Sequence, residues 1–304
     1  MSFQRPLNRI KSLRKNNIVV RNTVAGIRGL LSQNITRIPL FFLTLVAILA
    51  LFGESLAPYG YDERLIAPDG GIMLAEPPSV AHPLGTTGDG YDVLSRIIVG
   101  ARPTAIAGVV GGTMIVSIGL TVALLSGYLG GVVDETLMRI TDLFFAIPFI
   151  PFALVVVAFF GAGFWIAIFI IGILLWRSNA RVIRAQVLQI KERPYIQASK
   201  ASGASSRRIV LKHILPNVAP MAILYFALGI GVAIIAQASL AFVGVADAQT
   251  PSWGVMIRNA YFSGYLRQAW AWALVPGFMI AFTVLSTYLI GRSFESADQA
   301  TGGV

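Results

Sequence analysis

The stretch RPYIQASKASGASSRRIVLKHILPN, residues 193–217, is polar and basic and is broken by a glycine, yet it lies between two of the most apolar runs of the chain. Of the 304 residues, 56% are hydrophobic and only 12% are charged, and the mean hydropathy is +0.73. Soluble domains carry about 25% charged residues. Lipid is therefore the expected solvent for much of this chain, and the basic stretch must lie outside the lipid.

Working outward from this stretch, we find six apolar runs that are candidate membrane-spanning helices. A hydrocarbon core of about 30 Å needs roughly 20 apolar helical residues. The fourth run is short and is expected to extend by a turn at either end. The predicted spans are 38–52, 104–125, 143–160, 164–176, 218–243 and 271–291. We therefore predict an all-α integral membrane protein with six transmembrane helices.

The positions of the basic residues predict an orientation, because short cytoplasmic loops are enriched in Lys and Arg. Residues 1–37 hold eight basic residues and no acid, and residues 177–216 hold nine against one acid. The segment 54–92 carries seven acids against one Arg. We expect both termini in the cytoplasm, with 54–101 as an external loop and 177–216 as a cytoplasmic loop between the fourth and fifth helices. The net charge of +10 is then a topology signal, and no nucleic-acid partner is needed to explain it.

The predicted domains are a basic cytoplasmic N-terminal segment, 1–37, and a transmembrane domain, 38–304. The protein is expected to be a multi-pass protein of the cell membrane. Within the first segment, residues 5–31 mix basic and apolar side chains. This pattern fits either a helix on the anionic lipids of the inner leaflet or a disordered arm.

The quoted stretch predicts two short helices joined at a glycine. Pro194 suits a first helical position, and Gly203 suits a helix end. Ser205 or Ser206 is able to cap the second helix. Pro216 is expected to stop that helix at the membrane surface, because proline lacks an N–H group and clashes with the preceding turn.

The first of these helices, about 195–202, exposes small side chains. Ala198, Ala201 and Ser202 would let the backbone of another protein approach closely. Such a helix is suited to fit a partner's groove. On physical grounds alone, an ordinary basic loop that holds the topology explains the stretch equally well.

The stretch also resembles the cytoplasmic signature of ABC-type importer permeases, EAA-x3-G-x9-I-x-L-P. The spacing matches throughout, and the aligned residues are Gln197, Ala198, Ser199, Gly203, His213, Leu215 and Pro216. Gln replaces Glu, Ser replaces Ala, and His replaces Ile. The last change is common in the peptide and nickel subfamily, which often has HxLPN here. The family's Glu makes polar contacts at the ATPase interface, and Gln197 keeps hydrogen bonding but loses the charge.

Four further motifs, which extend the resemblance to about residues 38–295, support the same family. The segment HPLGTTGDGYDVLSRIIVGAR, 82–102, is similar to C-type subunits of oligopeptide, dipeptide and nickel importers, with Thr87 and Tyr91 in place of the usual Asp and Arg. The others are GYLGGVVDETLMRITDLFFAIP at 127–148, SLAFVGV at 239–245 and TPSWGVMI at 250–257.

The resemblance implies the partners of such a permease. A homologous second permease would complete one translocation path, two cytoplasmic ATPases would dock beneath, and an external binding protein would deliver substrate. The helix 195–202 would be the coupling helix that meets an ATPase. The implied coupling and docking residues are Tyr195, Gln197, Ala198, Ser199, Ala201, Gly203, His213, Leu215 and Pro216.

The sequence itself contains no ATPase motif. No Gly-Lys dipeptide occurs anywhere in the chain, so the Walker A phosphate loop is absent. We therefore expect a transport subunit that is not itself an enzyme, with ATP and Mg²⁺ held by partner ATPases and no cofactor or metal on this chain.

Three residues within the predicted spans are candidates for the path or its gate. Pro148 and Pro151 in the third span predict a kink, which is either static or a gate hinge. Gln237 lies deep in the fifth span and either lines a cavity or makes an interhelix hydrogen bond. Gly108 and Gly112 form a close-packing face, expected to lie within the subunit.

Aromatic residues follow the fifth span at the expected depth of the membrane interface. Such residues commonly form a belt there, and some are candidates to contact the binding protein. They are Trp253, Tyr261, Phe262, Trp270 and Trp272.

Alternative functions remain open at this point. A secondary carrier would need an ionisable group at the membrane midplane, and the spans lack a central one. A membrane enzyme would need clustered His, Asp or Glu, and a passive pore would need no ATPase. Among importers, a peptide substrate is favoured by the subfamily resemblance alone, with nickel or another small solute as the alternative.

Overall fold

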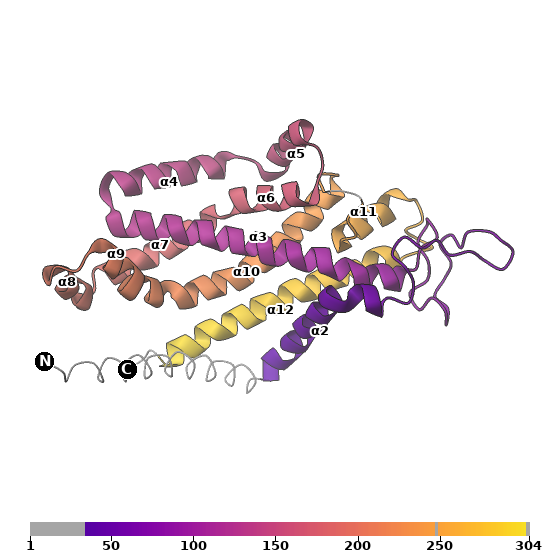
Figure 1. The fold of residues 1–304 in the computed structure, drawn as a ribbon, viewed down its shortest axis with the longest axis horizontal. Coiled ribbons are helices and arrows are strands. Elements are labelled where there is room, and N and C mark those ends of the chain that lie inside the picture. The colour runs from indigo at the N-terminus through magenta and orange to yellow at the C-terminus, as the bar shows by residue number, and fades with distance from the viewer. Residues whose placement is uncertain (1–33, 247–248, 302–304) are drawn as a thin grey trace, which may run out of the picture.

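The computed structural model describes residues 34–246 and 249–301. Within these ranges the chain is helical and contains no β-strand, apart from two isolated bridges, Ile66 with Ile72 and Thr86 with Asp92. The predicted segment 1–37 lies almost wholly outside the described residues. The long helices run roughly along the longest axis of the molecule (Figure 1).

Five helical segments are long and apolar enough to cross a membrane. They contain five of the six predicted spans, which are thereby confirmed as helices. They are α2 (Asn34–Leu56), α3 (Val93–Leu129), α6 (Phe164–Leu175) with α7 (Arg177–Lys191), the run from α9 (Ser206–Ile209) through η1 (Val210–Ile214) to α10 (Leu215–Phe242), and α12 (Ala271–Thr301).

The predicted third span, 143–160, is not one continuous helix, but the kink predicted at its prolines is confirmed as a break at Pro148. The chain forms α4 (Gly131–Ala146) and α5 (Phe149–Phe160), which meet at 85°, so the number of candidate spans is six only if this bent pair counts as one. The break falls at Ile147, which is extended because a residue before proline disfavours the helical region. Pro148 precedes α5, and Pro151 lies in its first turn, where a missing N–H is no loss.

The prediction that Pro216 stops a helix is also wrong. Pro216 is the second residue of α10 and follows the π-helical turn η1, in which the Leu215 N–H donates to the Val210 carbonyl. A π turn carries its hydrogen bonds across one more residue than an α-helix, which makes room for a proline ring. The Asn217 side chain donates to the His213 carbonyl at 2.5 Å, and the helix continues to Phe242.

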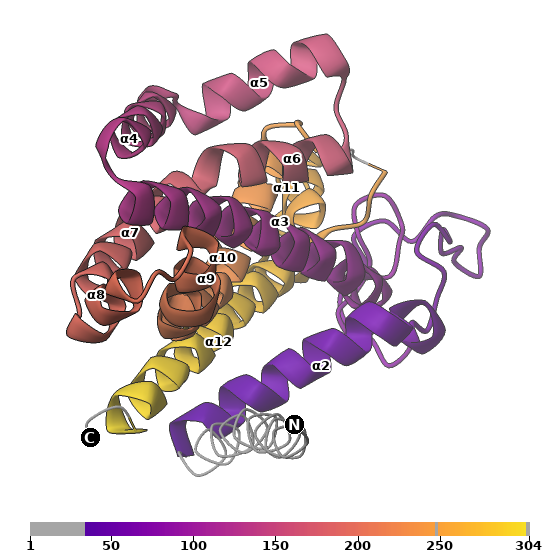
Figure 2. The ribbon, with the colours of Figure 1, turned by 60° about the vertical axis from the view of Figure 1, so that its left-hand side comes forward.

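The core of the subunit is built on the contact between α3 and α10. A Cβ atom added at Gly112 would lie 2.8 Å from the Ile230 backbone nitrogen, and one added at Gly108 would lie 2.8 Å from the Ile234 side chain. Small residues let helices approach closely in lipid, where no hydrophobic force drives them together. The prediction that this glycine face packs within the subunit is confirmed. In Figure 2 the α4–α5 pair and α2 lie on opposite sides of α3 and α10.

The two ends of the bundle differ. The first, here called the basic end, carries α8 (Pro194–Ala201) and α9, and the beginning of α2 and the end of α12 are directed towards it (Figure 1). The second, here called the loop end, carries the non-helical segment 57–92 and α11 (Trp253–Phe262). This segment is shorter than the predicted external loop 54–101, because α2 extends to Leu56 and α3 begins at Val93.

Candidate functional site

At the basic end, α8 is a two-turn helix with well-defined ends. Pro194 is its first residue, as predicted. Beyond its C-terminus the Gly203 N–H donates to the Lys200 carbonyl and the Ala204 N–H donates to the Ser199 carbonyl, both within 3.2 Å. This is a Schellman motif, which needs a residue in the left-handed region, and Gly203 has φ +79°. The predicted glycine joint is confirmed.

Only one side chain of α8 is buried. Ile196 is 2% exposed and packs in an apolar cluster with Ile183 and Val187 of α7 and with Ile209 and Ile214. Ser199 is half-buried, whereas Tyr195, Gln197, Ala198 and Ala201 are exposed. Thus α8 is attached to the subunit through one apolar anchor and presents its small side chains outward.

Gln197, which stands where the family signature has Glu, makes its contacts within the subunit. Its Nε2 donates to the Lys191 carbonyl at 3.2 Å and to Glu192 Oε2 at 3.4 Å. Both partners lie at the junction of α7 and α8. The side chain therefore helps to fix the angle at which α8 leaves α7, in addition to any contact with a partner.

The rest of the signature lies in the adjoining helix. Ser205 stands at the N-cap position of α9, but its side chain makes no capping hydrogen bond. His213 is the fourth residue of η1, and Leu215 and Pro216 begin α10. His213 and Leu215 are half-buried, and Pro216 is exposed. His213, Leu215 and Pro216 therefore lie in the segment that connects α8 and α9 to the long helix α10.

Ion pairs join α7, the helix that precedes α8, to α4. Arg184 of α7 binds Asp134, with its Nε 2.6 Å from Oδ1, and both side chains are mostly buried. Arg181 of α7 binds Asp142 in a more exposed pair. These ion pairs hold α4 against α7.

Gln237 of α10 lies inside the subunit. It is 1% exposed, and its Nε2 donates to the Ser252 hydroxyl at 3.0 Å. Ser252 caps α11 by accepting from the Val255 N–H. Of the two roles left open by the sequence, this geometry supports the interhelix hydrogen bond. Pro148 and Pro151 lie at the break before α5 and in its first turn.

The aromatic belt predicted after the fifth span holds only in part. Tyr261, Phe262 and Trp270 are exposed, but Trp253 and Trp272 are fully buried. The Trp253 indole N–H donates to the Ile97 carbonyl of α3 at 2.9 Å. The prediction of an exposed belt is wrong for Trp253 and Trp272, because α11 folds back against α3 and buries part of an apparently external segment.

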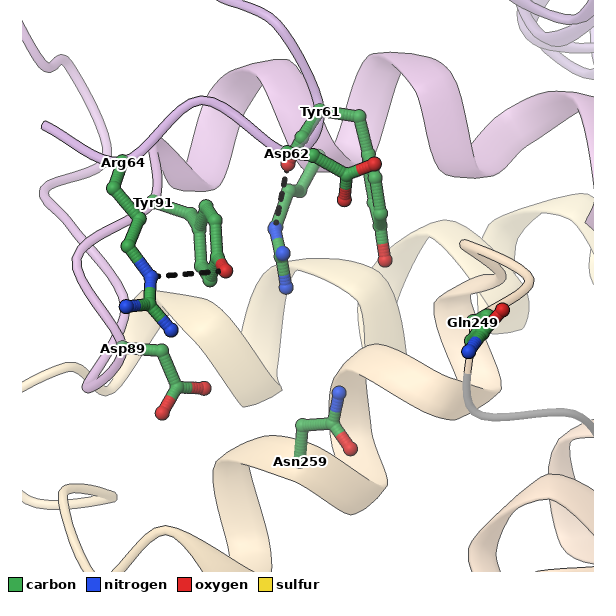
Figure 3. Close-up of a pocket in the computed structure, with 8 residues that line it drawn as sticks. Tyr61, Asp62, Arg64, Asp89, Tyr91, Gln249 and Asn259 are labelled. Atoms are coloured by element: carbon green, nitrogen blue, oxygen red, sulfur yellow. Dashed lines mark hydrogen bonds between the residues drawn. The ribbon is translucent and has the colours of Figure 1, made fainter.

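The loop end holds a pocket that was not predicted from the sequence. One wall comes from the segment 57–92 and the start of α3, and the other comes from the α10–α11 side (Figure 3). The first wall consists of Tyr61, Asp62, Arg64, Asp89, Tyr91 and Arg96, and the second of Gln249 and Asn259. Arg96 is 6% exposed, and its guanidinium carbon lies 4.4 Å from the Tyr61 ring centroid and 3.7 Å from that of Tyr91. A signal was present in the sequence, since Tyr91 replaces a usual Arg in the motif 82–102.

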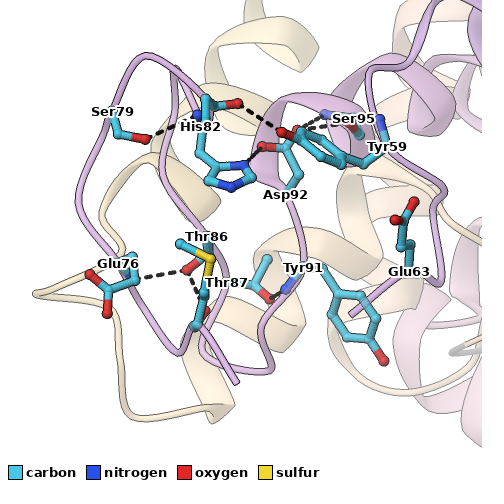
Figure 4. Close-up of polar contacts among 12 residues, drawn as sticks. Tyr59, Glu63, Glu76, Ser79, His82, Thr86, Thr87, Tyr91, Asp92 and Ser95 are labelled. Atoms are coloured by element: carbon cyan, nitrogen blue, oxygen red, sulfur yellow. Dashed lines mark hydrogen bonds and ion pairs between the residues drawn. The ribbon is translucent and has the colours of Figure 1, made fainter. Parts of the chain in front are cut away.

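Buried hydrogen bonds shape the segment that carries this pocket (Figure 4). Asp92 caps α3 by accepting from the Ser95 N–H and hydroxyl at 2.7 Å, and its other oxygen lies 3.0 Å from His82 Nδ1. The Thr86 hydroxyl donates to the Met73 carbonyl at 2.6 Å. The motif 82–102 is thus a folding element that fixes the loop on the first turn of α3.

Three comparisons with known proteins bear on this architecture. Residues 119–297 match the family described as the binding-protein-dependent transport system inner membrane component. The glutathione transport system permease protein GsiD of Pectobacterium atrosepticum is 36% identical over 259 residues, which cover 85% of this chain and 84% of that protein. The protein of the same name from Escherichia coli O6:K15:H31 is 34% identical over 266 residues, 87% of this chain and 86% of that protein.

The fold is similar to that of a solved ABC transporter. Two inward-facing crystal forms of the MetNI methionine ABC transporter superpose with TM-scores of 0.55 and 0.52, at 22% and 23% identity. Each covers 67% of this chain and, respectively, 97% and 95% of the solved chain. At this identity the similarity concerns the fold alone.

The chain therefore belongs to the family of binding-protein-dependent transport system inner membrane components. It is an ABC importer permease of the peptide, oligopeptide, dipeptide and nickel group, and a multi-pass protein of the plasma membrane. The resemblance deduced from the sequence motifs is confirmed.

Proposed function

We propose that this chain forms half of the translocation path of an ATP-driven peptide importer, and that α8 is the helix through which a separate ATPase drives it. A homologous permease would supply the other half of the path. Two ATPases, which hold ATP and Mg²⁺, would dock at the basic end, and an external binding protein would deliver peptide at the loop end.

The observation that carries this proposal is the construction of α8. It has a proline start, a Schellman end and one apolar anchor, Ile196, while its small side chains are exposed. A helix that served only to connect α7 with α9 would not need a fixed shape with an unoccupied small-residue face. A short rigid helix of this kind suits insertion into a groove of a partner.

The surroundings of α8 support an ATPase as this partner. A cavity of about 190 Å³ lies beside it, with Tyr128, Lys191, Gln197 and Lys200 among its lining residues. The two ammonium groups favour an acidic or hydrogen-bonding side chain of a partner. Neither Lys191 nor Lys200 forms an ion pair with an acid in the described part of the chain.

The charge of the two ends supports the proposed orientation. The segment 177–216, which contains α7, α8 and α9, holds nine basic residues against one acid, whereas 54–92 holds seven acids against one Arg. Short cytoplasmic segments are enriched in Lys and Arg. We therefore assign the basic end to the cytoplasm, which also puts the beginning of α2 and the end of α12 there.

A peptide substrate is supported by the relatives, whose names describe glutathione transport. Glutathione is itself a small peptide with free charged termini. The motif 82–102 is that of the subfamily that transports oligopeptides, dipeptides and nickel. No group of three or more His, Cys, Asp or Glu side chains able to hold a metal occurs in the described residues.

The experiment compares two valine substitutions of matched strain in the complete transporter. Gly203 and Gly264 have φ +79° and +78°, and neither has an atom within 4 Å of an added Cβ. Valine at either position therefore costs only backbone strain, about 1–2 kcal/mol. Gly203→Val should deform the end of α8, whereas Gly264→Val lies at the loop end.

The expected result is that Gly203→Val loses most ATP-dependent peptide uptake while ATP hydrolysis no longer responds to substrate, and that Gly264→Val keeps both. Membrane insertion should be unchanged in both variants. Normal uptake by Gly203→Val, or equal loss in the two variants, would show that α8 is not the coupling helix.

A further inference from the structure

The pocket at the loop end has the volume of a small-ligand site. Its volume is about 440 Å³, within the range of about 300–1,000 Å³ of such sites. Its walls come from the segment 57–92, the first turn of α3 and the α10–α11 side of the bundle (Figure 3). Neither α8 nor the helices that carry it contribute, so the pocket is separate from the proposed coupling site.

The deepest charged group of this pocket, Arg96, has unused donors. Its Nε donates to the Tyr61 carbonyl at 3.3 Å, and the rings of Tyr61 and Tyr91 cover the guanidinium group. Among the described residues, the terminal nitrogens make no hydrogen bond and no acid lies within 4.0 Å of them. Arg96 lines the cavity, so these nitrogens are accessible to a ligand there, and a guanidinium group presents paired donors that match a carboxylate.

The remaining charges of the pocket carry both signs, and Asp89 lies near enough to Arg64 to interact with it electrostatically. Asp62, Arg64 and Asp89 are exposed and line the same cavity as Arg96. None of these four residues forms an ion pair with another described residue, although Arg64 Nε donates to the Tyr91 hydroxyl at 3.3 Å. Cations and anions that line one cavity without a direct ion pair are complementary to a ligand that is itself dipolar.

The uncharged donors of the pocket agree with such a ligand. Burial raises the pKa of the Tyr61 hydroxyl above its usual value, although nearby Arg96 opposes the shift, so the hydroxyl remains protonated at neutral pH. Asn259 lies across the cavity from Tyr61 and Asp62 in Figure 3. An amide beside the charged groups offers both a donor and an acceptor for a peptide bond.

We propose that this pocket is an entry site for short zwitterionic peptides, in which Arg96 binds the α-carboxylate and Asp62 with Asp89 binds the α-ammonium group. The inference rests on the proposed function in that it takes peptide as the substrate. The alternative is that Arg96 serves only to hold the segment 57–92 on α3. That role would require neither the acids of the pocket nor the guanidinium donors that make no hydrogen bond among the described residues.

The test measures binding of three probes to the full chain in lipid nanodiscs, without the binding protein. The probes are trialanine, N-acetyl-trialanine, which lacks the ammonium group, and trialanine amide, which lacks the carboxylate. The variants are Arg96→Gln and the double variant Asp62→Asn with Asp89→Asn. Arg102→Gln is the matched control, because Arg102 is also on α3 but is paired with the exposed Glu54 outside the pocket.

Removing one charge from the pocket should lower the affinity only for those probes that carry the opposite charge bound by it. Arg96→Gln should weaken trialanine about tenfold, the loss expected of one charge-assisted contact, and leave trialanine amide unchanged. The Asp62→Asn, Asp89→Asn variant should weaken trialanine similarly and leave N-acetyl-trialanine unchanged. Arg102→Gln should change nothing. If Arg96→Gln does not fold, the double variant carries the test, because both of its positions are exposed.

Two results would overturn the inference. One is that the unmodified chain shows no saturable trialanine binding. The other is that the double variant binds all three probes as the unmodified chain does, which leaves Arg96 only as a residue that holds the segment 57–92 on α3. ATP-dependent trialanine uptake by the complete transporter is measured in parallel. Uptake without pocket binding overturns the entry site alone, whereas absence of uptake overturns the proposed function whatever the binding result.

Discussion

The basic end and the loop end of this permease are built in opposite ways. At the basic end, α8 is attached through one buried side chain, Ile196, and nearly everything else on it is exposed. At the loop end, a segment without helices is fixed by buried polar groups, among them His82, Thr86 and Asp92. The first end presents a surface to a partner, and the second encloses a pocket.

The difference shows that order has separate sources at the two ends. Helix α8 is ordered locally, because proline, the Schellman motif and one anchor define eight residues. The segment 57–92 is ordered by contacts between distant residues, such as the 3.1 Å hydrogen bond that the Tyr59 N–H donates to the Ser95 hydroxyl of α3. Substitutions at the loop end should therefore affect the stability of the fold, and those at α8 should affect coupling.

The largest loss of stability is expected from Gly112→Leu in the core between the two ends. The losses expected from substitutions at either end are compared with this one. The new side chain would meet the backbone of Ile230 and force α3 away from α10. We expect a loss of about 3 kcal/mol or more in stability and a low yield of folded protein. The control is Gly277→Leu on α12, where nothing lies within 4 Å of an added Cβ. Equal yields of the two variants would contradict the α3–α10 core.

The second effect in size is Asp92→Ala at the loop end. The change removes the cap of α3 and the buried partner of His82 and Ser95. We expect a loss of about 3 kcal/mol, since a cap contributes about 1 kcal/mol and each hydrogen bond to a charged group about 1.5–3 kcal/mol. Thermal unfolding in detergent measures it. A melting temperature unchanged from that of Glu54→Ala, an exposed acid, would show that the loop end is not ordered as described.

The third effect, Ile196→Ala, sharpens the contrast between the ends. Removing a buried Ile side chain costs about 2–5 kcal/mol, and we expect this cost to weaken mainly the attachment of α8, because Ile196 is the only buried side chain of that helix. We expect the melting temperature to change little and the affinity for the ATPases to fall. The control is Tyr195→Ala, at an exposed position of the same helix. This change removes a side chain that could contact the ATPase but leaves the packing of Ile196 intact. A large global destabilisation by Ile196→Ala would make α8 part of the core.

The smallest effect is expected from Arg102→Gln. Its ion pair with Glu54 is exposed at both side chains, 59% and 74%. Exposed pairs contribute at most about 1 kcal/mol. Stability measured by thermal unfolding should therefore be within that range of the unmodified protein. A larger loss would show that the join between α2 and α3 depends on this pair.

Much of the fold could be predicted from the sequence, because long apolar runs and helix-end residues act locally. The five long helices follow from the roughly 20 residues that a lipid bilayer demands. The start of α8 at Pro194 and its end at Gly203 follow from the missing N–H of proline and from the tolerance of glycine for positive φ.

The errors arose where one local signal permits two structures. The run 143–160 is apolar throughout, so hydropathy alone did not separate one kinked helix from two helices at 85°. Pro216 would end an ordinary α-helix, but the preceding π turn absorbs it. The burial of Trp253 depends on α11 folding back against α3.

The outer pocket could not be predicted because its residues are brought together by an irregular segment. Tyr61 and Arg96 are 35 positions apart in the chain, and their contact depends on the path of 57–92. No periodic pattern encodes that path. The replacement of a usual Arg by Tyr91 was visible in the motif, but its meaning emerges only when its ring is found against Arg96.

The most direct test of the central claim is gentle purification of the tagged chain from native membranes, with mass spectrometry of the proteins that accompany it. A variant lacking residues 195–203 is purified in parallel. We expect the full chain to bring down a second permease and ATPases, and the variant to retain the permease and lose only the ATPases. Recovery of the full chain alone, in good yield and monodisperse, would contradict the account and favour a carrier that works without an ATPase.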